Sequence, residues 1–175
     1  MDRLMEQVDG YCERVGFELW AEPLNAVTNL AFLLAAFALG RYLVGVEART
    51  GRRDPQSRVL IFLLWAIGLG SLAFHTFATI WAGIADTLPI IIIILVYVYL
   101  ALRRFFALPI AAAVLGPPAL IGLAYVFGQT GFAGATYVPA LIGMMVLSVA
   151  AALRGHNQIA YGLAVSSLVF GVSLG

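Results

Sequence analysis

The chain has 175 residues, of which 62% are hydrophobic and only 11% are charged. Soluble domains carry about 25% charged residues, so this composition excludes an ordinary soluble domain and indicates a membrane protein. The net charge is +1 and no basic stripe exists outside the loops, which argues against a nucleic-acid partner. The single cysteine, Cys12, excludes an intramolecular disulfide.

Residues 1–21 form an acidic, polar segment ahead of the first apolar run. The segment lacks the order of basic and then apolar residues that marks a cleavable signal peptide. Carboxylates gather in it and at its end, at Asp9, Glu13, Glu18 and Glu22. Oxygen ligands at such close spacing suit calcium, and a solvated acidic arm explains them equally well.

Six apolar runs follow, each close to the roughly 20 residues that a bilayer span requires. We predict that all six are helices, because a helix satisfies its own backbone hydrogen bonds in lipid. The fold class is therefore all-α, a polytopic membrane helix bundle formed by residues 22–175. The spans are expected at about 22–44, 57–77, 84–102, 107–127, 137–153 and 159–175.

Prolines punctuate three of these runs. Pro23 and Pro89 are expected in the first turns of the first and third helices, where the missing N–H group costs little. The sequence Gly116-Pro117-Pro118 lies in the middle of the fourth run and should kink it.

Arginines occupy alternate loops and predict the orientation of the chain. The second and fourth loops carry none, whereas the first, third and fifth hold Arg49, Arg52, Arg53, Arg58, Arg103, Arg104 and Arg154. The positive-inside rule places these arginine loops in the cytoplasm and the N-terminus outside. Trp20 and Trp81 then fall at the outer interface, where tryptophan is enriched.

This orientation brings polar residues of three helices to one depth. His75 lies near the outer end of the second helix, with Ser71 one turn deeper; the third helix begins with Asp86, and the first with Glu22 and Asn25. An ionisable residue at membrane depth is costly and is therefore a candidate functional group. Mutual hydrogen bonding and a metal site explain the convergence equally well.

Four segments of the first half of the chain resemble a known family. They are Tyr11-Cys12-Glu13, Trp20-Ala-Glu-Pro-Leu-Asn-Ala-Val-Thr-Asn29, Gly70-Ser-Leu-Ala-Phe-His75 and Asp86-Thr-Leu-Pro89. Together they resemble the alkaline ceramidases, which belong to a superfamily of seven-helix membrane hydrolases that also includes the adiponectin-receptor-like proteins. The remaining helices agree with this family only in number and hydropathy.

The resemblance implies roles for individual residues. His75 would bind zinc, Asp86 would act as acid and base, and Ser71 would donate a hydrogen bond to the oxyanion. The carboxylates of Asp9, Glu13 and Glu22, with the carbonyl of Tyr11, would bind calcium. An asparagine of the family's calcium segment has no counterpart here, because Val15 falls near its place.

The resemblance also implies two more zinc ligands, from a His-x-x-x-His on a seventh helix. The sequence ends within an apolar run at Gly175 without a polar cap. We therefore expect a seven-span fold truncated after six spans. Because catalytic zinc takes three protein ligands, we expect the 175-residue chain to bind zinc weakly or not at all, and its own activity to be in question.

The leading hypothesis is an integral membrane, zinc-dependent amide hydrolase that acts on a ceramide-like lipid. Such a protein would sit in the bilayer of a bacterial inner membrane and take its substrate from that bilayer. The first alternative is a receptor-like or structural membrane protein in which the polar cluster only ties helices together, and the second is a small transporter with a proton relay. The sequence leaves the lipid and the oligomeric state open.

The orientation can be tested with Cys12. The arginine distribution predicts that this thiol reacts with a membrane-impermeant maleimide in intact cells. Labelling confined to inverted vesicles would reverse the orientation and move the polar cluster to the cytoplasmic side.

Overall fold

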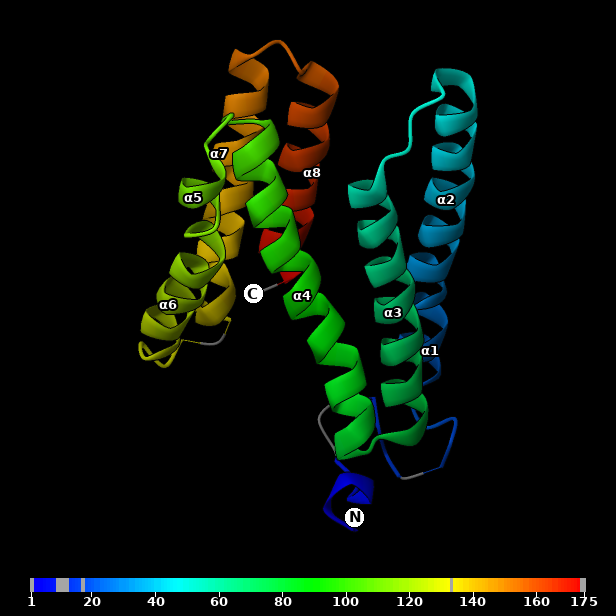
Figure 1. Ribbon diagram of the computed structural model, residues 1–175. Coiled ribbons are helices and arrows are strands. Elements are labelled where there is room, and N and C mark those ends of the chain that lie inside the picture. Colours follow the sequence, from blue (N-terminus) through cyan, green and yellow to red (C-terminus); the bar gives the residue numbers. More distant parts are fainter. Residues whose placement is uncertain (1, 9–12, 17, 133, 174–175) are drawn as a thin grey trace. The chain divides into compact units, whose positions relative to one another are not determined.

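The computed structural model describes residues 2–8, 13–16, 18–132 and 134–173 (Figure 1). Within these residues there is no strand, and one isolated bridge joins Gln7 to Thr79. The helices are η1 (Asp2–Met5), α1 (Pro23–Thr28), α2 (Leu30–Thr50), α3 (Pro55–Phe77), α4 (Ile80–Arg104), α5 (Ile110–Ala113), α6 (Gly116–Gly128), η2 (Ala135–Tyr137), α7 (Val138–Leu153) and α8 (Asn157–Ser173). The predicted all-α class is confirmed.

Five helical stretches in the described residues are long and apolar enough to cross a membrane. They are Pro23–Thr50, Pro55–Phe77, Ile80–Arg104, Ile110–Gly128 and Ala135–Leu153. Each overlaps one of the first five predicted spans, and the sixth predicted run coincides with α8. The chain is therefore a multi-pass membrane protein.

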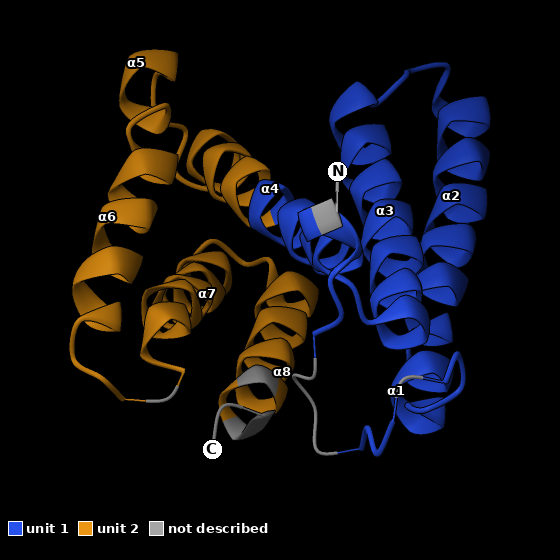
Figure 2. Ribbon diagram, turned by 90° about the horizontal axis from the view of Figure 1, so that it is seen from below, with its two compact units in different colours: residues 1–93 blue, residues 94–175 orange. Residues whose placement is uncertain are grey.

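The chain divides into two units, residues 1–93 and 94–175 (Figure 2). In the second unit, α7 and α8 form a hairpin in which the Ser148 hydroxyl donates to the Ala160 carbonyl at 2.7 Å. The expected kink of the fourth span is an interruption, because α5 ends at Ala113 and α6 begins at Gly116. The polar cluster belongs to the first unit.

Helix α3 is the central helix of the first unit. Asp54 caps its N-terminus by accepting a hydrogen bond from the Ser57 amide at 3.2 Å, and Pro55 fits its first position. Small residues on α3 let its neighbours approach closely. Toward α2, the side chain of Leu33 packs against Gly68.

Helix α4 meets α3 backbone to backbone at Gly70. A Cβ atom at Gly70 would overlap the Ala85 carbonyl oxygen and come within 3.0 Å of the Asp86 amide nitrogen. The expectation that Pro89 lies in a first turn was wrong, because α4 begins at Ile80 and Pro89 lies inside it. Pro89 has no N–H group and so cannot donate the usual helical hydrogen bond to the Ala85 carbonyl four residues earlier. The carbonyl oxygen that faces Gly70 is therefore the one that lacks its i+4 donor within α4.

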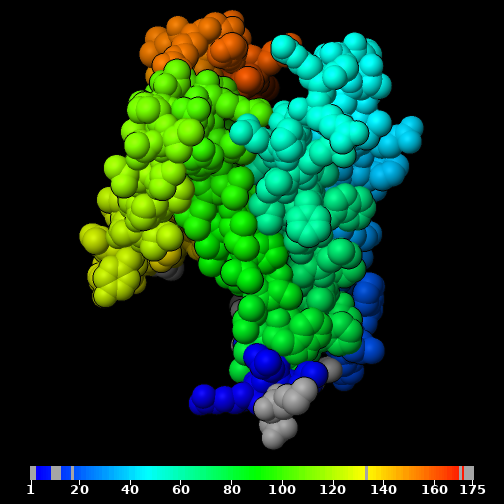
Figure 3. All heavy atoms as spheres, viewed as in Figure 1, coloured from blue at the N-terminus to red at the C-terminus, as the bar shows by residue number. Residues whose placement is uncertain are grey.

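The N-terminal segment holds the turn between α3 and α4. The Val8 amide donates to the Ala78 carbonyl at 2.7 Å, and the Ile80 amide donates to the Glu6 carbonyl at 3.1 Å. The dark-blue N-terminal residues accordingly lie against this turn in the ribbon and space-filling views (Figures 1 and 3). The pairing fixes where α3 ends and where α4 begins.

The contact at Gly70 can be tested by Gly70→Ala. The added methyl group meets backbone, which cannot rotate away, so we expect a loss at the upper end of the 1–3 kcal/mol that is typical of overpacking, or more. Thermal unfolding of the detergent-purified protein measures it. Gly122→Ala in α6 is the control, because its methyl group meets nothing within 4 Å; equal melting temperatures for the two variants would contradict the close approach.

Candidate functional site

The site is built around His75 in the last turn of α3. The His75 side chain is buried, and its Nδ1 atom lies 2.5 Å from the Glu22 Oε2 atom. Glu22 immediately precedes α1, so the pair ties the start of the first span to the end of the second. Ser71 lies one turn before His75 on the same helix and is also buried.

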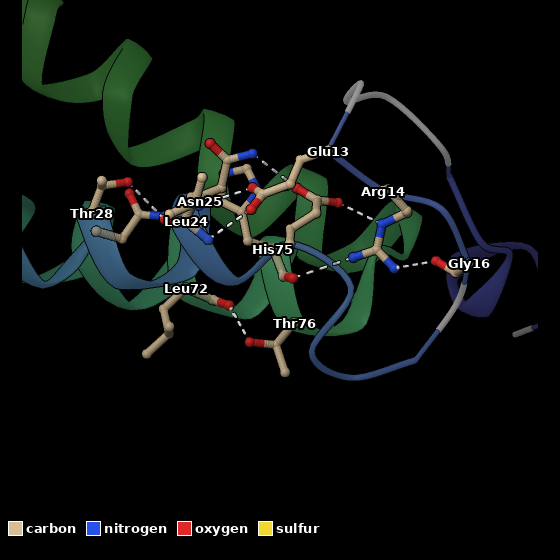
Figure 4. Close-up of polar contacts among 11 residues, drawn as sticks. Glu13, Arg14, Gly16, Leu24, Asn25, Thr28, Leu72, His75 and Thr76 are labelled. Carbon is tan, nitrogen blue, oxygen red and sulfur yellow. Dashed lines mark hydrogen bonds and ion pairs between the residues drawn. The ribbon is translucent and has the colours of Figure 1, made fainter.

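Glu22 is a buried carboxylate with partners on both oxygens. Its side chain is 2% exposed. The Arg14 Nε atom lies 2.5 Å from Oε1, while Oε2 accepts from His75 and, at 3.4 Å, from the Asn25 side-chain amide. Figure 4 shows Arg14, Asn25 and His75 gathered where the N-terminal loop meets α1 and α3. A buried charge is stable only when it is paired and hydrogen-bonded in this way.

Asp86 lies in the second turn of α4, next to the Gly70 contact. Its carboxylate interacts with the Ser71 hydroxyl. Its Oδ1 atom is buried and has no hydrogen-bond partner among the described residues. An orphaned carboxylate oxygen inside a polar cluster is a position from which a water or substrate group can be bound.

The Glu13 carboxylate binds backbone amides, unlike Glu22, which binds side chains. Its two oxygens accept from the backbone amides of Leu24 at 2.7 Å and Asn25 at 3.0 Å, in the first turn of α1. These amides have no partner within the helix, so the Glu13 carboxylate caps it. Asp9 and Tyr11, the other residues expected at calcium, lie outside the described residues, and the calcium site stays a prediction.

A catalytic zinc site takes three protein ligands. No group of three or more His, Cys, Asp or Glu side chains close enough to hold a metal ion occurs in the parts of the chain that are described. His75 nevertheless has the surroundings of a zinc ligand, because a metal-binding histidine usually donates its second ring N–H to a carboxylate. The described residues thus fit one ligand of a zinc site and its supporting carboxylate.

Arg14 is the residue that sequence reasoning missed. The arginine pattern was used to orient the chain, yet Arg14 belongs to the segment that this pattern places outside. An arginine that departs from the topology rule, next to carboxylates, was the available signal for a buried ion pair.

Several apolar spans, with buried Ser71 and His75 and partly buried Asp86 at the adjoining ends of two helices, define a multi-pass membrane protein with a polar cluster. The Ceramidase family model matches residues 8–173, and the chain belongs to this family. The predicted resemblance is confirmed, and membership supports a membrane hydrolase of the ceramide amide bond. No curated protein and no solved structure matches the chain.

Truncation of Glu22 and of Glu13 to alanine should lower the melting temperature by different amounts. Glu22→Ala leaves the Arg14 guanidinium buried without its carboxylate, and breaking a buried pair in this way costs about 3–5 kcal/mol. Glu13→Ala removes a helix cap, a loss of about 1 kcal/mol. Thermal unfolding should give a much lower melting temperature for Glu22→Ala; a larger effect of Glu13→Ala would show that Arg14 and His75 do not depend on Glu22.

Proposed function

We propose that the chain is a zinc-dependent hydrolase that cleaves the amide bond of a ceramide-like lipid, and that the polar cluster of its first unit belongs to the catalytic site. The observation that supports this most directly is the arrangement of Glu22, His75, Ser71 and Asp86 at the ends of neighbouring spans. Family membership supplies the substrate class. The metal and the individual roles are the proposal.

His75 is assigned to zinc through its Nε2 atom. Its Nδ1 atom is engaged by the Glu22 carboxylate at 2.5 Å, which fixes the tautomer and the orientation of the ring. A carboxylate on Nδ1 also raises the basicity of Nε2, which strengthens a metal bond. When bound, zinc supplies Lewis-acid polarisation of the amide carbonyl and activation of a water molecule.

Asp86 is assigned as the acid and base. Hydrolysis of an amide takes a proton from the attacking water and gives one to the departing amine, so a single carboxylate can serve both steps. The acceptor is the buried Oδ1 atom, which has no hydrogen-bond partner in the described part of the chain. The backbone contact at Gly70 holds this carboxylate beside α3, so little motion is needed to bring it to the reacting atoms.

Ser71 is assigned to the oxyanion. Its hydroxyl lies beside the Asp86 carboxylate and can donate to a carbonyl oxygen that gains negative charge in the transition state. The products are a fatty acid and an amine, both amphiphiles. A site at the end of two spans suits such a substrate, because its chains can stay in the bilayer.

Turnover of a fluorescent ceramide by variants of the full-length protein tests these assignments. Asp86→Asn keeps the shape but removes the proton acceptor, so we expect a loss of about 10²–10⁴ in rate, with bound zinc retained. His75→Ala should lose zinc and activity together, as elemental analysis would show. Ser71→Ala should cost less than either, since one oxyanion donor is worth roughly 3 kcal/mol.

Thr76→Val is the matched control for Ser71→Ala. Thr76 neighbours His75, but its hydroxyl donates to the Leu72 carbonyl of its own helix at 2.7 Å, so activity should not change. Full hydrolysis by Asp86→Asn, or no amide cleavage by the unaltered protein, would reject the proposal. The receptor-like or structural reading of the cluster would then stand.

A further inference from the structure

Arg14 is an arginine buried at the centre of the site. Its side chain is 1% exposed. The guanidinium donates to three acceptors: the Glu22 carboxylate at 2.5 Å, the Gly16 carbonyl at 3.1 Å and the His75 carbonyl at 3.2 Å (Figure 4). A long, strongly solvated side chain is withdrawn from water only when its charge and its donors are all used.

The contact with the His75 carbonyl places a positive charge at the C-terminal end of α3. The carbonyls in the last turn of α3 have no amide donor within the helix, and the helix dipole makes this end attractive to cations. Arg14 supplies such a cation. It therefore holds the carboxylate that orients the His75 ring and, at the same time, the backbone of His75 itself.

The same guanidinium engages one of the two oxygens that Glu22 would offer to a metal cation. The Oε1 atom of Glu22 is bound by Arg14 and Oε2 by His75, while both oxygens of Glu13 are bound to the first turn of α1. These are the two described carboxylates expected at calcium. Every oxygen of the two carboxylates already accepts at least one protein hydrogen bond.

We propose that Arg14 is the resident cation of this site, a positioning residue that neutralises Glu22 and fixes His75 in place of a divalent cation. The protein should then need no calcium for folding or for turnover. This inference rests on the proposed function, since His75 is the group that Arg14 positions. Arg14 itself touches no substrate.

The first experiment uses the unaltered protein with CaCl2, MgCl2 or EGTA. We expect the same melting temperature and the same turnover of fluorescent ceramide in all three, because the site already holds its cation. Turnover lost in EGTA and restored by calcium but not magnesium would overturn the inference. A melting temperature that rises with calcium concentration alone would overturn it as well.

The second experiment removes the guanidinium. Arg14→Met should lower kcat about 10- to 100-fold, as is typical when a group supporting a metal ligand is lost, with little change in KM. Arg14→Lys should recover part of kcat, because an ammonium keeps the charge but cannot match the guanidinium's fork of donors. An unchanged kcat in both variants would overturn the inference, even if the melting temperature falls.

Arg58→Met is the matched control. Arg58 also pairs with a glutamate, Glu47, but its side chain is 55% exposed and lies at the opposite end of α3. We expect no change in kcat for this variant. If Arg14→Met does not fold, Arg14→Lys and the calcium series still decide the question. If no ceramide is cleaved under any condition, the proposed function fails, and the response of the melting temperature to calcium alone judges Arg14.

Discussion

The first unit depends on keeping one buried carboxylate charged. Glu22 is almost fully enclosed and is held by Arg14 from the N-terminal loop and by His75 from α3. Removing Glu22 or Arg14 leaves the other charge of this pair buried without its opposite charge, which is far more costly than losing an exposed ion pair. The segment that precedes the first span is therefore part of the site, and its position is coupled to the orientation of the histidine.

A second constraint places the Asp86 carboxylate by backbone packing, without using long side chains. Gly70 lets the backbone of α4 approach α3, and Pro89 leaves the Ala85 carbonyl at this contact without its helical donor. Asp86 is thus positioned by main-chain packing, next to Ser71. Short, rigid connections of this kind hold reacting groups more accurately than flexible side chains reaching across a gap.

Hydropathy and arginine placement predicted the helical class, five of the spans and the meeting of polar groups from three helices, because these follow from local composition. They missed the start of α4, placing it at residue 84 instead of Ile80. That start is set by residues 6–8, which pair with the turn before α4, and no local pattern records such a long-range contact. The different contacts of Glu13 and Glu22 could not be predicted for the same reason, because both are acids in one segment. The fold brings Glu13 to the first turn of α1 and Glu22 to His75.

The choice between arginine and calcium has a consequence for control of the site. A guanidinium is charged at every physiological pH and is present at a fixed stoichiometry, whereas a calcium site fills and empties with the ion's concentration. With Arg14 in place, the orientation of His75 follows from the fold alone. Under the proposal made for Arg14, the carboxylate cluster does not make the site a sensor of calcium. The N-terminal loop that carries Arg14 is then the segment through which the orientation of His75 can be altered.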